Sequence, residues 1–165
     1  MIEISEKQLP TNRTLGLVKS MQSDISNKKS LGISIIRIHL GIILLAHGWL
    51  KVSVFTVLGT VDYFASIGLP PIIAYLVIFG ELLGGTALVL GIQTRLASSL
   101  SVPILFGAAV INSDKGWLHS ATGGGWEYAA SLTVIACAIA ISGSGQYLRI
   151  NRNPLNRFLP SFIKN

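Results

Sequence analysis

The chain has 165 residues, of which 50% are hydrophobic and 12% are charged, about half of the charged share in an ordinary soluble domain. This composition excludes a typical water-exposed domain and predicts a membrane protein. The net charge of +6 does not indicate nucleic-acid binding, because the basic residues gather near the two ends of the chain and in one short loop, with apolar segments between them.

Residues 1–30 are polar and contain no apolar core of the kind that a signal peptide needs. We expect a loosely ordered cytoplasmic tail here, and an amphipathic surface helix around residues 14–22 is the alternative. The first apolar segment then serves as its own signal for membrane insertion.

Four apolar segments follow this tail, and their lengths suit membrane-spanning helices. A helix needs ~20 residues to cross the hydrocarbon, with a lower limit near ~17. The first two segments reach this length, whereas the third and fourth are marginal and need flanking residues or a thinner bilayer. The segments run over residues 31–52, 71–92, 96–112 and 128–142. The sequence therefore predicts an all-α, four-transmembrane-helix bundle.

The basic residues predict that both ends of the chain lie in the cytoplasm. In this orientation ten Lys and Arg residues lie inside, two lie outside and Arg37 lies within the membrane, as the positive-inside rule requires. The predicted chain consists of a polar tail, a four-helix membrane domain and a basic cytoplasmic tail, over residues 1–30, 31–148 and 149–165.

The first apolar segment contains the stretch RIHLGIILLAHGWLK, in which basic side chains interrupt an apolar helix. Arg37, His47 and Lys51 fall on one arc about 80° wide at ~100° per residue. A charged side chain inside a membrane costs ~3 kcal/mol and normally finds a partner in the bundle. Glu81, near the middle of the second segment, is expected to pair with Arg37 or His47. The pair is either a structural contact that sets the helix register or part of a proton-relay or ligand site.

The histidines do not predict a haem or metal site. His39 and His47 are eight residues apart on one helix, a rise of ~12 Å, so they cannot be the two axial ligands of one haem. His119 lies in an outer loop, and the spacing of metal-binding motifs is absent. We therefore predict no metal and no cofactor held by a recognisable motif.

The outer loop NSDKGWLHSATGGGWEY, residues 112–128, is the remaining concentration of polar residues. Trp117 and Trp126 are typical of the lipid headgroup level. The three glycines at 123–125 allow a sharp turn or close approach to a ligand. Glu127 is either a favourable start for the fourth helix or a binding residue.

Several stretches occur together in a characteristic order: RIHLGIILLAHGWLK, then GLP at residues 68–70, then GELLGGTALVLGIQTRLA, then KGWLHSATGGGWEYA. As a set they resemble the DoxX family of small bacterial and archaeal membrane proteins, over residues 31–148. The residues at positions typical of that family are Arg37, His47, Gly48, Lys51, Glu81, Gly84, Gly85, Gly91, Thr94, Arg95, Gly124, Glu127 and Tyr128.

This resemblance implies a multi-pass protein of the bacterial or archaeal plasma membrane. It also implies association with redox systems, since members of the family include the small membrane subunit of thiosulfate:quinone oxidoreductase. The chain departs from the family pattern in two places: SGSGQYLRINR follows the fourth helix where the family tends to have Gly-Pro-Gly, and residues 1–30 have no counterpart. Both departures lie outside the predicted membrane helices, so they concern partner contacts more than the fold.

Two classes of function remain open. The first is a membrane subunit of an oxidoreductase that meets a quinone or another small redox substrate between the helices, while a partner protein supplies the redox cofactor. Its candidate substrate-binding residues are Arg37, His47, Lys51, Glu81 and Glu127. The second is a non-enzymatic small-solute carrier or a scaffold for partner proteins. Four helices are few for a carrier unless the chain forms a homo-oligomer.

Overall fold

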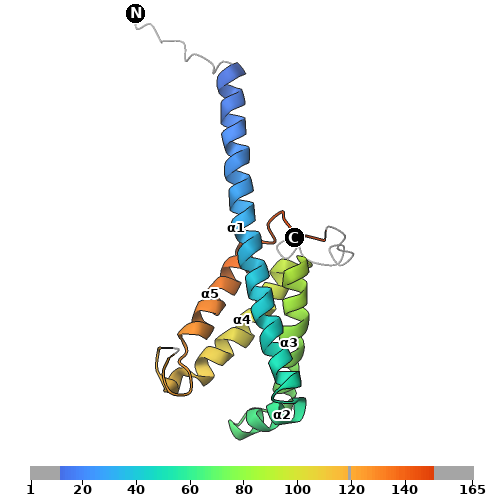
Figure 1. Cartoon of the computed structure of the whole chain (residues 1–165), viewed down its shortest axis with the longest axis vertical. Helices are drawn as coiled ribbons and strands as arrows, with labels where there is room; N and C mark the ends of the chain where they lie inside the picture. Colours follow the sequence, from blue (N-terminus) through green and yellow to red (C-terminus); the bar gives the residue numbers. More distant parts are fainter. Residues whose placement is uncertain (1–11, 119, 151–165) are drawn as a thin grey trace, which may run out of the picture.

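The computed structural model describes residues 12–118 and 120–150, and this part of the chain is helical apart from its turns and loops (Figure 1). The elements are α1 (Asn12–Ser53), α2 (Val57–Ser66), α3 (Pro71–Leu90), α4 (Thr94–Ile111), the short 3-10 helix η1 (Ser113–Lys115) and α5 (Glu127–Ser142). The all-α prediction is confirmed for the described residues. His119 and most of the basic C-terminal tail lie outside them.

Helix α1 is 42 residues long, and its two halves have different surroundings. The C-terminal half packs against α3, whereas the N-terminal half stands clear of the other helices (Figure 1). The expectation of a loosely ordered tail is therefore wrong for residues 12–30, which continue the first apolar helix without a break. Once the apolar half has nucleated the helix, each added turn costs little, because propagation is far easier than nucleation.

Three helical stretches are long and apolar enough to cross a membrane: Arg13–Ser53 within α1, then α3 and α4. Helix α5 is also apolar but has only 16 residues, a length of ~24 Å against the ~30 Å of hydrocarbon in a typical bilayer. All four predicted apolar segments are thus helices. The number of spans and their orientation stay predictions.

The sequence did not predict α2. This helix follows α1 after a short turn and lies across that end of the bundle (Figure 1). Thr56 caps it, because its Oγ1 accepts a hydrogen bond from the backbone N–H of Gly59 at 3.1 Å. Thr60 and Phe64 are its buried residues. Ten residues with two buried positions are too few for a clear helical period.

The helices meet around an apolar core that draws on α1, α3, α4 and α5. Its buried members are Leu40, Leu44, Leu88, Ala97, Leu105, Leu132, Ala136 and Ile139. The backbones of α1 and α3 come close at two glycines: a Cβ on Gly41 would lie 2.8 Å from the carbonyl oxygen of Gly85. Small residues allow such close backbone packing between membrane helices, and this contact sets how α1 and α3 are aligned along their length.

Candidate functional site

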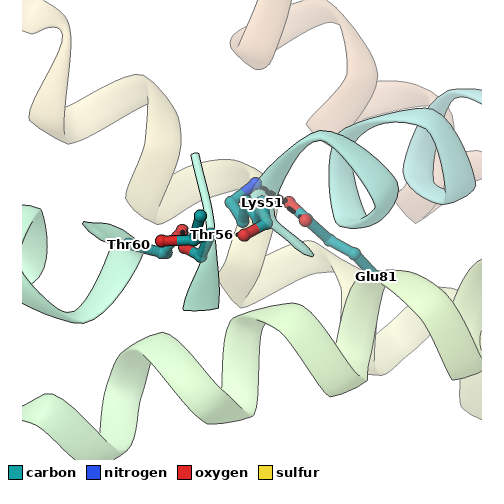
Figure 2. Close-up of polar contacts among 4 residues, drawn as sticks. All are labelled: Lys51, Thr56, Thr60 and Glu81. Atoms are coloured by element: carbon teal, nitrogen blue, oxygen red, sulfur yellow. Dashed lines mark hydrogen bonds and ion pairs between the residues drawn. The ribbon is translucent and has the colours of Figure 1, made fainter. Parts of the chain in front are cut away.

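Lys51 and Glu81 form an ion pair between α1 and α3. The Lys51 Nζ lies 2.8 Å from Oε1 and 2.7 Å from Oε2 of Glu81 (Figure 2). Lys51 stands in the last turn of α1, and Glu81 is buried in the middle of α3. A charge with both carboxylate oxygens engaged is compensated within the bundle, as a buried charge must be.

Helix α2 is tied to the same place. The Thr60 hydroxyl donates to the carbonyl oxygens of Lys51 and Thr56, at 3.2 and 2.9 Å (Figure 2). The backbone that carries the Lys51 side chain is therefore held by α2 as well as by α1. This support is one that the sequence did not indicate.

A direct pairing of Glu81 with Arg37 or His47 was predicted and is wrong, because its direct partner is Lys51. The close contact of Gly41 with Gly85 aligns the two helices so that a Cβ on Gly48 would lie 3.2 Å from the Glu81 Cβ. Lys51 is one turn beyond Gly48 and reaches back to the carboxylate. Arg37 is eleven residues before Gly48, ~16 Å along the helix axis, which places it far from Glu81.

Arg37 instead binds the backbone at the opposite end of α3. It is fully buried, with 0% exposure. Its Nη1 donates to the carbonyl oxygens of Leu88 and Val89 at the C-terminal end of α3. Carbonyl groups at a helix end have no partners within the helix and carry a partial negative charge. A guanidinium is well suited to this position.

The remaining donors of Arg37 hold the segment that follows α5. Nε donates to the Ser144 carbonyl at 3.0 Å, and Nη2 donates to the carbonyls of Tyr147 and Leu148 at 2.9 and 3.1 Å. A guanidinium has five N–H donors, and these contacts with α3 and the last described segment engage all three of its nitrogens. Arg37 is therefore separate from the other predicted site residues, and its contacts join the end of α3 to the segment after α5.

His47, Lys51 and Glu81 line a common cavity of about 100 Å³ between α1, α3, α4 and α5. Tyr128 of α5 also lines it, with its ring centroid 6.3 Å from that of His47. The other walls are apolar, including Leu44 and Leu105. No hydrogen bond joins His47 to Glu81, but both side chains line the same cavity.

Two larger cavities adjoin the ion pair. One, of about 340 Å³, is lined by both Lys51 and Glu81 and by residues of α2, α3 and α4, among them Phe64 and Ile104. The other, of about 400 Å³, lies beside α2 and is lined by Lys51, Phe64 and other α2 residues. The ion pair thus supplies polar groups to the small cavity and to the larger, mostly apolar cavities beside it.

Glu127 does not line any of these three cavities. The loop before it is closed by hydrogen bonds from the backbone N–H groups of Trp126 and Glu127 to the carbonyls of Gly116 and Trp117, at 3.2 and 3.1 Å. The Trp117 and Trp126 rings meet edge to face at 4.4 Å. Tyr128 is the residue of this region that reaches the cavity, and only its place in the family pattern pointed to it.

In the described ranges, 12–118 and 120–150, no three His, Cys, Asp or Glu side chains gather as a metal ion would need. His39 is exposed on the outside of α1, away from the cavity that His47 lines.

Comparison with known proteins adds the family. The DoxX family model matches residues 32–114, a range that includes Lys51 and Glu81. The chain is also similar to a Bacillus subtilis (strain 168) protein named "Putative oxidoreductase CatD", with 32% identity over 114 residues, which cover 69% of this chain and 81% of that protein. No solved structure matches. With half of its length matched by the family model, and with a relative of this identity, the chain belongs to the DoxX family.

Proposed function

We propose that this protein is a membrane subunit of a redox system, and that it binds a small apolar redox molecule, with quinones as the candidate class, beside the Lys51–Glu81 pair. The observation that carries the proposal is the position of this pair: its two side chains line both a 340 Å³ cavity with mostly apolar walls and the small cavity of His47. The name of the Bacillus subtilis relative agrees with a redox role.

The membrane frame of the proposal is a four-span chain with both ends in the cytoplasm of a bacterium or archaeon. The distribution of basic residues supports this orientation. The packing of α5 along α4 (Figure 1) supports counting α5 as the fourth span despite its short length. In this frame Lys51, Glu81 and α2 lie toward the outer side of the membrane.

The cavity sizes suggest two different uses. Volumes of about 340 and 400 Å³ fall in the ~300–1,000 Å³ range of small-molecule sites. The 100 Å³ cavity has room for only a few waters at ~30 Å³ each. We assign the larger cavities to the ring and tail of the bound molecule, and the small one to waters that connect the ion pair with His47.

The chemistry of the pair suits a molecule that gains or loses protons. The Lys51 ammonium can donate a hydrogen bond to a carbonyl oxygen, and the Glu81 carboxylate can accept one from a hydroxyl. His47 can pass protons near neutral pH, because imidazole titrates there. The electrons are exchanged with a partner protein that carries its own redox cofactor.

A binding measurement tests this proposal. The full chain in nanodiscs is titrated with a short-chain ubiquinone or menaquinone analogue, and tryptophan fluorescence is followed. We expect saturable binding that weakens about 10- to 100-fold in Glu81→Gln, the range for loss of a hydrogen bond to a charged group. Asp114→Asn, an exposed carboxylate in η1, is the matched control and should bind normally. No saturable binding, or equal binding by Glu81→Gln, would refute the proposal.

A further inference from the structure

The half of α1 that stands clear of the bundle carries an apolar stripe that no other described element covers. Val18, Met21 and Ile25 are 55%, 63% and 65% exposed. They follow one another at spacings of three and four residues, so they lie on one face of the helix. Most of the stability of a helix in a protein comes from the packing of its apolar face rather than from intrinsic propensity. The stripe therefore needs something to pack against.

The same stripe continues along the membrane half of α1. With Lys28 and Gly32 at the two intervening positions, Ile35, His39 and Ile42 continue the alternating spacing of three and four, and these three are exposed. We name Val18, Met21, Ile25, Ile35, His39 and Ile42 the outer seam of α1. It lies on the side of the helix opposite the fully buried Leu40 and Leu44. Gly32 stands on the seam between its two halves, and a Cβ there would meet nothing within 4 Å.

We propose that the outer seam of α1 packs against the same seam of a second copy of this chain, as a parallel two-helix coiled coil that runs from water into the membrane. A seven-residue repeat of apolar positions is the pattern of such a coil. Two copies inserted in the same orientation present α1 in parallel around a two-fold axis along the membrane normal. An identical, in-register helix is therefore the partner that this repeat fits.

The charges beside the seam favour this partner over a lipid surface. With Val18 and Ile25 as the first positions of successive heptads, Asp24 is the last residue of one heptad and Lys29 the fifth of the next. In a parallel coil these two positions face each other across the interface. Asp24 of each copy thus meets Lys29 of the other copy.

His39 gives the second reason for a helical partner within the membrane. Its imidazole is exposed on the outside of α1 and makes no hydrogen bond within the part of the chain that the structure describes. A polar side chain facing lipid is costly, whereas across a helix pair it can hydrogen-bond to its counterpart. Lys28 also falls on the seam, at the border of the polar and apolar halves, where its long stem can carry the ammonium to the headgroups.

Disulfide cross-linking of the full chain in native membranes tests the seam. Cys137, the single cysteine, is first replaced in Cys137→Ser. Ile25→Cys is then compared with Ser23→Cys, an exposed control on the opposite face. We expect about tenfold more oxidised dimer for Ile25→Cys, because only seam positions bring two Cα atoms within the ~7 Å that a disulfide needs.

Charge exchange provides an independent test that leaves the apolar residues unchanged. Asp24→Lys and Lys29→Asp should each weaken dimerisation of the purified protein in nanodiscs about fivefold, as expected for two exposed ion pairs. The variant with both exchanges should restore the dimer. A one-copy mass with equal cross-linking at positions 23 and 25 would overturn the proposal. A monomeric mass in nanodiscs, together with burial of fluorescent labels at positions 21 and 25 in vesicles that contain anionic lipid, would also overturn it and would indicate a lipid surface as the partner. A cross-link from position 25 to a different protein would overturn it as well.

Discussion

The Lys51 ammonium contacts both carboxylate oxygens of Glu81, at 2.8 and 2.7 Å, and so joins the end of α1 to the middle of α3. The side chains are 19% and 7% exposed, so the two differ in their access to the surroundings. Lys51 stands near the helix end, where its stem can turn toward the headgroups. Glu81 has no such route, and its charge depends on Lys51.

We therefore expect Lys51→Met to destabilise the protein more than Glu81→Gln. Removing the partner of a buried charge costs ~3–5 kcal/mol. Lys51→Met leaves the Glu81 carboxylate unpaired, and Glu81 is the more deeply buried of the two residues. The double variant Lys51→Met/Glu81→Leu should recover most of the loss, since it leaves no unpaired charge. Thermal unfolding in detergent measures all three. A double variant less stable than Lys51→Met would show that the pair does not act as a unit.

Arg37 should tolerate no substitution, including lysine. Its guanidinium holds carbonyl groups of α3 and of the segment after α5, and the ammonium of lysine cannot reproduce that planar set of donors. Loss of the guanidinium leaves the buried Ser144 carbonyl without this donor, at ~1–3 kcal/mol, and removes the contacts that join α3 to the last described segment. We expect low protein levels for Arg37→Lys and protease cleavage near residues 143–150. Normal levels and an intact C-terminal segment would contradict the structural role.

His47→Gln should separate function from stability. Glutamine keeps the polarity and approximate size of histidine but does not titrate near neutral pH. Under the proposed function the protein level stays normal, while the redox response of quinone-loaded membranes is lost. If the response and its pH profile are unchanged, His47 takes no part, and the site reduces to a structural ion pair.

The contact between α1 and α3 should not accept a side chain at Gly41. A Cβ there would lie 2.8 Å from the Gly85 carbonyl oxygen, and overpacking of this kind typically costs ~1–3 kcal/mol. Gly107→Ala is the matched control, because its Cβ would meet nothing within 4 Å and alanine favours a helix by ~1 kcal/mol. Thermal unfolding should show Gly41→Ala below, and Gly107→Ala at or above, the parent protein.

Reporter fusions test the membrane topology. Fusions after residue 30, at residues 93–95 and after residue 148 should all report the cytoplasm, because the positive-inside rule places these basic segments inside. A single fusion that reports the outer side would rule out the four-span arrangement with both ends in the cytoplasm.

The sequence by itself determined the helical class and the position of each apolar helix. Long apolar stretches interrupted by turns have few other solutions in a membrane, since the backbone must satisfy its own hydrogen bonds there. It also marked Glu81 as a residue that needs a partner, because a charge at that depth is costly. The helical course of residues 12–30 was foreseen only in part, by the alternative of a surface helix around residues 14–22, since a polar composition does not reveal that a neighbouring helix will propagate through it.

Only the tertiary structure decided which basic side chain pairs with Glu81. Helical angle placed Arg37, His47 and Lys51 on one face of α1, and depth then favoured Arg37 or His47 as the partner of Glu81. The close approach of Gly41 and Gly85 selected one alignment of α1 against α3, and with it the Lys51 pair. The alignment of two helices depends on the packing of many side chains at once. No local pattern in the sequence reveals the outcome of that packing. The same packing places Arg37 where it donates hydrogen bonds to the carbonyl groups at the C-terminal end of α3, and it places Tyr128 in the wall of the cavity that His47 lines.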